Sequence, residues 1–540
     1  MNHKALKALA VAGTLMVLAA AGCTDTTVQP KSTVATNNVF NDPSSYQSFL
    51  ARIYAGLAVS GQQGPAGNAD IQGIDEGFSQ YMRLYWELEE LPTDAAVIGW
   101  GDIGLPEMNT MTWTSSSTMV VAMYYRIYVQ AAMANEFLRQ TTAAALASRV
   151  VSPTLKANIQ TYRAEARFLR ALSYYHALDL FGNVPLVTEA DPIGGAPPKQ
   201  VTRDSLYRFV VREATAIHDS LLVGGTAASY GRATQGADDM LLAELYLNKG
   251  VFTGTTAYDS ALAAASRVIA GPYSLDPTWR RMFSADNGSS PEIIFMVESN
   301  TNVTQTYGGV TFLIHASCGG KDVAANYGID YCWGGTRLKP ETYNLFAAGD
   351  TRSAFFYHGG TSVDSLQKVS VDTLSNFQDG IAAPKFTNAP STGTTCTSAS
   401  NCPTFVNTNF PIWRLSEAYL IYAEANLRGG GGSQATALGY VNAIRERAYG
   451  GVAGDITAGQ LTLQFVLDER GRELMWEAHR RTDLVRYGMF AGAAYIWGWK
   501  GGNPNGFFQT GVATPLTYNL YPLPASELVA NPNLTQNPGY

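Results

Sequence analysis

The chain has few charged residues and no excess of basic ones. Only 15% of its 540 residues are Asp, Glu, Lys or Arg, and 37 basic residues stand against 44 acidic ones. A protein that binds nucleic acid needs a basic face to neutralise phosphates, so this balance argues against nucleic acid as a partner. Beyond the N-terminal segment no apolar run reaches about 18 residues, so the body of the chain is not predicted to cross a membrane.

Motifs of the common enzyme classes are also missing. The chain contains no Gly-x-Ser-x-Gly, no His-Glu-x-x-His and no phosphate-binding P-loop. His176 lies on an apolar helix face and is interpreted as a core residue. Glu89, Glu90 and Asp94 are close enough in sequence to form a glycosidase pair, which leaves a surface glycoside hydrolase as an alternative. We expect a protein that is not an enzyme and that needs no cofactor or metal.

Residues 1–22 are typical of a bacterial signal peptide. A positive start precedes the apolar run Ala8–Ala21, which is too short to span a bilayer. The ending Ala-Ala-Gly-Cys resembles a lipobox, in which the signal is cut before the cysteine and the cysteine then carries lipid. This pattern predicts a lipid on Cys23 and a flexible tether over residues 23–39. The alternative is an ordinary secreted protein that is cut after an Ala-x-Ala site.

Four cysteines remain after Cys23, and an even number in an exported chain favours disulfides. Two short loops are predicted, one closed by Cys318 and Cys332 and the other by Cys396 and Cys402. Zinc is the alternative, but neither a Cys-x-x-Cys motif nor a nearby histidine pair supports it. Calcium has no support from EF-hand-like spacing either.

Helical periodicity dominates both ends of the chain. The segment 154–181 carries two apolar stripes, as expected of a helix that packs on both sides. Alternating helices of this kind resemble tetratricopeptide (TPR) repeats. Between residues 271 and 410 the periodicity fades, and a β-type run appears at 293–297. Helices are predicted over 44–59, 118–140, 154–181, 203–222, 234–249, 256–270, 413–428, 434–448 and 461–487.

The helix predicted over 461–487 carries the densest cluster of titratable residues. Glu469 with Arg472, and Glu477 with Arg481, have helical i,i+3 and i,i+4 spacing. An acid/base pair of Glu473 and Glu477 is the catalytic alternative. We interpret the cluster as a structural ion-pair network.

Four segments, taken in order, resemble the SusD/RagB family. The first is Arg-Ala-Glu-Ala-Arg-Phe-Leu-Arg-Ala at 163–171, followed by Tyr-Tyr at 174–175 and Leu-Phe-Gly-Asn-Val-Pro-Leu at 180–186. The others are Ile-Trp-Arg-Leu-Ser-Glu-Ala-Tyr-Leu-Ile-Tyr-Ala-Glu-Ala at 412–425, the charged segments 468–474 and 477–484, and the ending with Tyr-Pro-Leu-Pro at 521–524 and residues 531–540.

This resemblance implies a mainly α fold in one large domain over residues 40–540. Four TPR-like helix pairs form a scaffold in 40–270 and 411–540, and 271–410 is a loop-rich, partly β ligand-binding region. Members of the family are lipid-anchored in the outer membrane and face the exterior. They bind oligosaccharides or peptides and deliver them to a partner TonB-dependent transporter of the SusC type. The alternative is a scaffold subunit of the transporter complex that binds no nutrient.

The resemblance also points to two loops as ligand contacts. Trp100 is flanked by glycines, which suits an exposed loop, and Asp102 follows it. The second loop carries Tyr327, Tyr331 and Trp333, close to the predicted disulfide at Cys332. Aromatic faces stack on sugar rings, and carboxylates bind hydroxyls. The alternative is that these rings fill space beneath the loops.

Overall fold

The computed structural model describes residues 39–65, 67, 69–320, 322–356, 369–377, 379–393 and 396–540. The predicted signal peptide, the lipidation site Cys23 and nearly all of the tether lie outside the described residues. The chain divides into two compact units, residues 1–46 and 47–540. The architecture below is that of the second unit.

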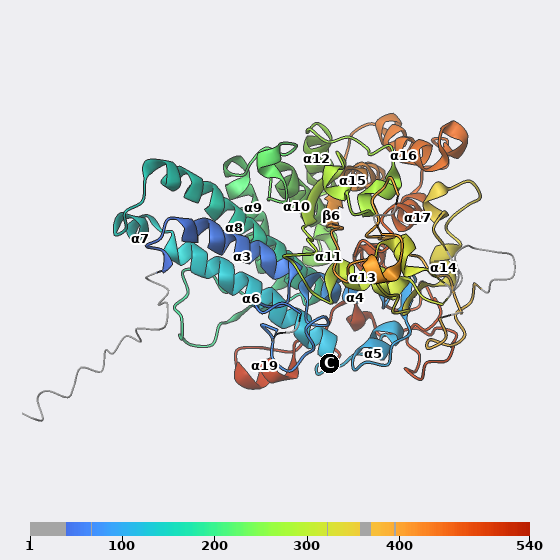
Figure 1. Ribbon diagram of the computed structural model, residues 1–540, viewed down its shortest axis with the longest axis horizontal. Helices are drawn as coiled ribbons and strands as arrows, with labels where there is room; N and C mark the ends of the chain where they lie inside the picture. The colour runs from blue at the N-terminus through green and yellow to red at the C-terminus, as the bar shows by residue number, and fades with distance from the viewer. Residues whose placement is uncertain are drawn as a thin grey trace, which may run out of the picture. The chain divides into compact units, whose positions relative to one another are not determined.

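The prediction of a mainly α fold is confirmed, with 48% helix and 6% strand (Figure 1). The helices are α3 (Ser44–Ala58), α4 (Tyr81–Glu90), α5 (Leu105–Thr110), α6 (Thr118–Gln140), α7 (Ala143–Ala147), α8 (Pro153–Leu180), α9 (Arg203–Ile217), α10 (Gln235–Leu247), α11 (Lys249–Thr253), α12 (Tyr258–Ile269), α13 (Gly309–Ser317), α14 (Pro340–Tyr343), α15 (Leu415–Leu427), α16 (Gln434–Tyr449), α17 (Leu463–Glu473), α18 (Arg480–Arg486) and α19 (Ala525–Ala530).

The long helices pack as neighbouring pairs. Helix α6 lies against α8 and α8 against α9, while α10 packs on α12, α12 on α15 and α15 on α16. Helix α8 shows how the sequence sets its ends. Ser152 caps the first turn by accepting a hydrogen bond from the Leu155 amide (3.2 Å), and Pro153 occupies the first position. Gly182, with φ of 73°, follows the last turn.

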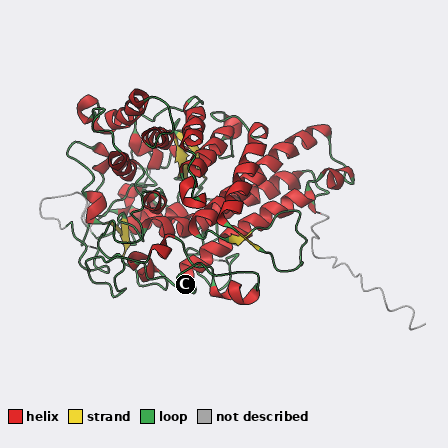
Figure 2. Cartoon of the chain, turned by 180° about the vertical axis from the view of Figure 1, so that it is seen from behind, coloured by secondary structure: helices red, strands yellow, loops and turns green. Residues whose placement is uncertain are grey.

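Strands are few and short (Figure 2). They form three antiparallel pairs: β1 (Ala96–Ile98) with β5 (Thr336–Leu338), β2 (Val184–Pro185) with β3 (Gln200–Val201), and β4 (Ile293–Val297) with β6 (Phe410–Arg414). Each pair joins segments that helices or loops separate in sequence. The run predicted at 293–297 is therefore a strand, and it pairs with the segment that leads into α15.

The prediction of a single helix over residues 461–487 is wrong. Helix α17 ends at Glu473 and α18 begins at Arg480, with Trp476 and Ala478 at φ of 61° and 64° between them. Left-handed residues cannot continue a helix. The break turns Arg481 away from Glu477, and Arg481 pairs instead with Asp179 (2.6 Å).

The interpretation of the charged cluster as an ion-pair network is confirmed. Glu469 binds Arg472 (2.7 Å), as the i,i+3 spacing predicted. Glu477 binds Arg414 (2.7 Å) and Lys385 (2.6 Å). All of these groups are buried, and burial without partners would cost several kcal/mol per charge, so the pairs fix these segments to one another.

The three carboxyl groups considered for hydrolysis are buried as well. Glu89, Glu90 and Asp94 are each at most 1% exposed. The Glu90 carboxylate accepts the Ala478 amide (2.8 Å), and the Asp94 carboxylate accepts Arg480 (2.6 Å). Burial raises the pKa of Glu89 to about 8. These groups tie α4 and the residues just after it to α18 and the residues just before it, and they do not face solvent.

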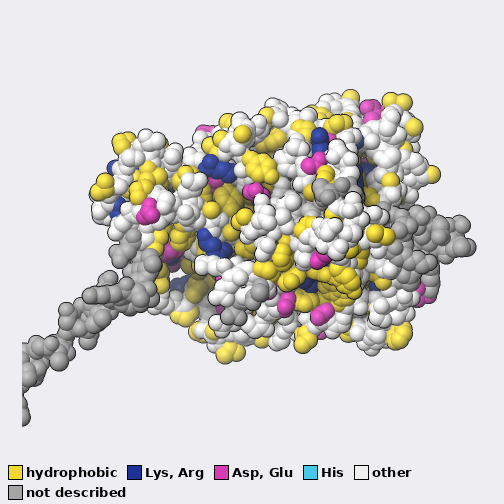
Figure 3. All heavy atoms as spheres, in the orientation of Figure 1, with side chains coloured by type: hydrophobic (Ala, Val, Ile, Leu, Met, Phe, Trp, Pro, Cys, Tyr) yellow, Lys and Arg dark blue, Asp and Glu magenta, His cyan; other side chains and the backbone are white. Residues whose placement is uncertain are grey.

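On the face shown in Figure 3, charged side chains are few and lie scattered among apolar and uncharged polar groups. Within the described ranges, no helix is both long and apolar enough to cross a membrane. The same part of the chain holds no group of three His, Cys, Asp or Glu residues arranged to bind a metal.

His176 is a core residue, as predicted. Its side chain is 2% exposed, its ring stacks on Tyr85 at 4.0 Å between centroids, and its Nδ1 lies 2.8 Å from the Tyr81 hydroxyl. Burial lowers the pKa of His176 to about 3. The folded protein therefore keeps this imidazole neutral at pH values where the unfolded chain protonates it.

We expect the free energy of unfolding of His176→Phe to fall less steeply than that of wild type as the pH is lowered. Below a pH of about 6.5 the unfolded wild-type chain binds one proton that the folded chain does not. That proton contributes a slope of up to about 1.4 kcal/mol per pH unit. Urea unfolding of wild type and variant between pH 7 and pH 4.5 measures the difference. His218→Phe, at a partly exposed ring, is the control. Equal slopes for wild type and His176→Phe would contradict this assignment.

Candidate functional site

A short strand pairing brings two distant loops together. In the β1–β5 ladder, Ala96 faces Leu338 and Ile98 faces Thr336. The ladder continues one step further, because the Gly99 amide donates to the Gly335 carbonyl (2.9 Å). The residues that follow β1 therefore lie beside the residues that precede β5.

The outer edge of β1 is also held. The side chain of Asn109, in α5, accepts from the Ile98 amide (3.0 Å) and donates to the Ile98 carbonyl (2.8 Å). The Asn109 side chain thus makes the two backbone hydrogen bonds that a neighbouring strand would make to Ile98, so this edge of β1 is paired. Trp100 is thus two residues beyond a backbone position that is fixed from both sides.

The ring of Trp100 lies against the loop before β5. Its Nε1 donates to the Gly334 carbonyl (2.6 Å), and its ring centroid is 6.2 Å from that of Trp333. A Cβ at Gly335 would lie only 2.7 Å from the Trp100 ring, so a glycine is required there. Sequence reasoning proposed both tryptophans, and the structure brings them together.

Trp333 is held by His315 and has a further aromatic neighbour. It stacks on His315 with 4.3 Å between centroids and an angle of 25°. The Trp333 amide donates to the His315 carbonyl (2.8 Å), and burial lowers the pKa of His315, which favours a neutral imidazole. Trp333 also neighbours Tyr307, with ring centroids 6.3 Å apart.

We call Trp100, Trp333 and Tyr307 the aromatic row. Adjacent rings are tilted by 48° and 49°, so the row is not flat. The two tryptophans are half-buried, and Tyr307 is 42% exposed. Tyr307 was missed in the sequence. A signal was present, because Tyr307-Gly308-Gly309 repeats the pattern of Trp333-Gly334-Gly335.

A buried cation supports the row. The Arg83 guanidinium lies 3.8 Å from the Phe78 ring centroid and 4.0 Å from that of Phe312, and Phe312 packs edge-on against Trp100. Arg83 Nε donates to Glu87 (2.8 Å). Desolvation raises the pKa of Glu87, although Arg83 opposes this shift. Trp100 thus packs on Phe312, and Phe312 lies against the buried, paired charge of Arg83.

The other three predicted residues have different positions. Tyr331 is 68% exposed at the rim, and its carbonyl oxygen lies 2.5 Å from His315 Nδ1. Asp102 is exposed in the loop after Trp100. Tyr327 is only 5% exposed, and its hydroxyl donates to Asp322 (3.3 Å), so this ring lies under the loop. For Tyr327 the structure favours the space-filling alternative.

Two disulfides are present, Cys318–Cys332 and Cys396–Cys402. The first joins the end of α13 to the residue before Trp333. The Gly334 amide also donates to the Cys318 carbonyl (2.9 Å). A covalent bond and a backbone hydrogen bond therefore hold Trp333 in place.

The aromatic row suits an uncharged ligand with ring faces. Exposed Trp and Tyr present an apolar face and a polar edge, and fixed rings lose little entropy on binding. A ligand with C–H groups on its faces and hydroxyls on its edge would match both features.

The chain is similar to proteins of one known family. A family model described as the SusD family matches residues 291–540. The chain is 32% identical to the "Starch-binding protein SusD" of Bacteroides thetaiotaomicron, covering 92% of each chain. It is 24% identical to "SusD-like protein P2" of Formosa agariphila, covering 97% of this chain and 98% of that one.

Solved structures share the fold. The surface glycan-binding protein A of B. thetaiotaomicron, in complex with laminarihexaose, matches with a TM-score of 0.68 at 20% identity, covering 92% of this chain and 99% of that one. A SusD superfamily protein of the same organism matches with a TM-score of 0.70 at 22% identity and the same coverage.

We expect the double variant Cys318→Ser/Cys332→Ser to lower the free energy of unfolding by about 3 kcal/mol, because the unfolded chain gains the entropy of an open loop. The matched control is Cys396→Ser/Cys402→Ser. Its cysteines are 6 residues apart instead of 14, so the loss should be smaller. Urea unfolding under non-reducing conditions measures both, and a larger loss in the control would contradict this expectation.

Proposed function

Because this chain belongs to the SusD family, we propose that it is a glycan-binding protein whose aromatic row stacks on sugar rings. The observation that carries the proposal is the row itself. Three partly exposed rings from distant segments lie with successive centroids 6.2 and 6.3 Å apart. Side chains that only filled the core would be buried like Trp86 and Trp113, which are at most 1% exposed.

We propose a starch-type α-glucan as the ligand. The tilts of 48° and 49° between adjacent rings favour a chain that curves from one sugar to the next over a flat ribbon. An α-1,4-linked glucan curves in this way, whereas a β-1,4-linked glucan is extended. The relative at 32% identity is named for starch binding, which supports the same choice.

The charge distribution supports an uncharged ligand. Trp100, Trp333 and Tyr307 carry no charge, and Arg83 beneath them is 3% exposed and paired with Glu87. Asp102, two residues after Trp100, is an exposed carboxylate that can accept hydrogen bonds from sugar hydroxyls. Stacking, and not charge, would therefore supply most of the binding energy.

We further propose that the protein acts at the cell surface without catalysis. Residues 1–22 would be removed, and lipid on Cys23 would hold the mature chain in the outer membrane through the tether of residues 23–39. A SusC-type TonB-dependent transporter beside it would receive the glycan. Anchoring both proteins in one membrane raises their effective concentration without further contact area.

Isothermal titration with a long maltooligosaccharide tests the site. We expect Trp100→Ala, Trp333→Ala and Tyr307→Ala each to weaken binding about tenfold, because each removes one stacking surface. The control is Tyr440→Ala, which removes a half-buried ring stacked on Tyr419 at 4.4 Å on the scaffold. Wild-type affinity in all three row variants would refute the site, and a wild-type protein that binds no glucan would favour the scaffold alternative.

Lipid attachment has its own test. We expect Cys23→Ser to leave the protein uncleaved or soluble, because no thiol is available for acylation, while maltooligosaccharide affinity stays unchanged. Membrane fractionation and labelling with an alkyne-tagged fatty acid measure this. The double variant Cys318→Ser/Cys332→Ser should still be labelled. Labelling of Cys23→Ser would contradict the assignment.

A further inference from the structure

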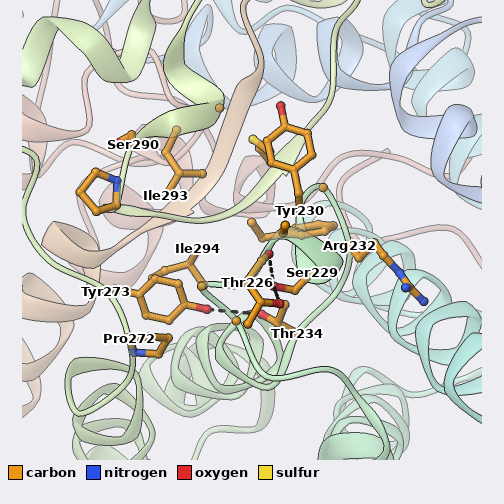
Figure 4. A pocket seen from close by; sticks show the side chains of 18 of the residues that line it. Thr226, Ser229, Tyr230, Arg232, Thr234, Pro272, Tyr273, Ser290, Ile293 and Ile294 are labelled. Carbon is orange, nitrogen blue, oxygen red and sulfur yellow. Dashed lines mark hydrogen bonds between the residues drawn. The ribbon is translucent and has the colours of Figure 1, made fainter.

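A sizeable cavity of the described residues lies apart from the aromatic row. It has a volume of about 360 Å³ and shares no residue with the row. Its walls come from the loop over residues 224–234 before α10, from Pro272 and Tyr273 after α12, from residues 288–291, and from strand β4 (Figure 4). Three other cavities are each about 10 Å³, which is room for a water molecule only.

The size of this pocket matches a small ligand. Sites for small molecules are typically about 300–1,000 Å³, so this one lies at the lower end of that range. It has room for one or two sugar rings and not for a long chain bound along its whole length. The pocket and the row would therefore take ligands of different length.

The lining is almost free of charge. Its one charged side chain is Arg232, and Arg232 Nε donates to Glu165 (3.1 Å), so its charge is already compensated. The remaining polar side chains carry hydroxyl groups, and Pro272 and strand β4 supply apolar surface. The hydroxyl-bearing residues of the lining are Thr226, Ser229, Tyr230, Thr234, Tyr273, Ser289 and Ser290.

Glycines fix the two tyrosines that enter the lining from separate segments (Figure 4). A Cβ at Gly288 would lie 2.4 Å from the Tyr230 hydroxyl, and a Cβ at Gly224 would lie 2.2 Å from the Tyr273 hydroxyl. Both tyrosines therefore occupy notches that only glycine leaves open. Because the rings are set before any ligand arrives, little entropy is lost in ordering them.

The tyrosine hydroxyls retain hydrogen-bonding capacity. The Tyr230 hydroxyl accepts from Asn409 Nδ2 (3.3 Å), and the described residues offer no acceptor for its own hydrogen. Tyr230 is 45% exposed, so both its ring and its hydroxyl are accessible. The Tyr273 hydroxyl lies 3.4 Å from the Thr234 hydroxyl, which is a long contact.

We propose that this pocket is a second saccharide site, which takes an uncharged mono- or disaccharide with one sugar face against Tyr230. Neutral hydroxyls around an apolar wall suit a polyhydroxylated ring and disfavour an anion or a cation. The choice of a glucose disaccharide as probe rests on the proposed function, whereas the pocket itself does not depend on the aromatic row.

The test uses the mature chain and maltose as the probe. In the double variant Trp100→Ala/Trp333→Ala we expect saturable maltose binding in the millimolar range by isothermal titration or saturation-transfer NMR. Adding Tyr230→Ala should weaken that binding about tenfold. Adding Ala227→Trp should do the same, because the larger side chain fills the cavity. The matched control is Val223→Ala, next to the lining and 60% exposed.

The outcomes separate the two sites. If the double variant shows no saturable binding while wild type binds maltose, the second site is refuted and the proposed function stands. If binding to the double variant persists but neither Tyr230→Ala nor Ala227→Trp reduces it, the pocket is again refuted. If Trp100→Ala/Trp333→Ala binds maltose as wild type does and only the pocket variants lose affinity, the second site is supported, and titration with the long maltooligosaccharide decides the aromatic row separately.

Discussion

The antiparallel pairing of β1 with β5 is the constraint on which the candidate site depends. It joins residues 96–98 to residues 336–338 and continues to the bond between Gly99 and Gly335. Without this register, Trp100 would not reach the Gly334 carbonyl or lie beside Trp333. Arg337, which is buried in the same pairing, donates to the Asp379 carbonyl (2.7 Å) and so ties the loop that contains Asp379 to β5.

The helical scaffold holds that pairing through buried charges. Asp94, just before β1, binds Arg480 of α18 (2.6 Å), and Glu90 accepts the Ala478 amide (2.8 Å). Arg414 binds Glu477 (2.7 Å), so β6 joins the same network. Much of the small charged fraction of the chain is used inside the fold, and the surface that remains suits a neutral ligand.

The helices could be predicted from the sequence because their periodicity is local. The limits of α6 and α16 match the predicted ones within a residue, since apolar spacing marks both, and Ser433 and Gly450 cap α16. The break after Glu473 could not be predicted, because Trp476 and Ala478 adopt left-handed conformations that tertiary contacts impose. One of these contacts is the bond from Trp476 Nε1 to the Ala95 carbonyl (3.2 Å).

The site was only half predictable for a similar reason. Trp100 and Trp333 stand out in the sequence as aromatics beside glycine, but their adjacency is set by strand pairing. Tyr307 is also an aromatic beside glycine, and it belongs to the row only because its ring centroid lies 6.3 Å from that of Trp333. Tyr327 lies in the same aromatic segment as Trp333 and yet turns inward to Asp322.

The origin of the three rings in separate segments has a consequence for biogenesis. Trp100 meets its neighbours only after more than 200 further residues have been made, since Gly334 lies 234 positions later. A chain truncated before residue 307 would carry Trp100 without either neighbour of the row. Under the proposed function, sugar capture requires the whole polypeptide, and an affinity column carrying the glycan would separate full-length molecules from truncated ones.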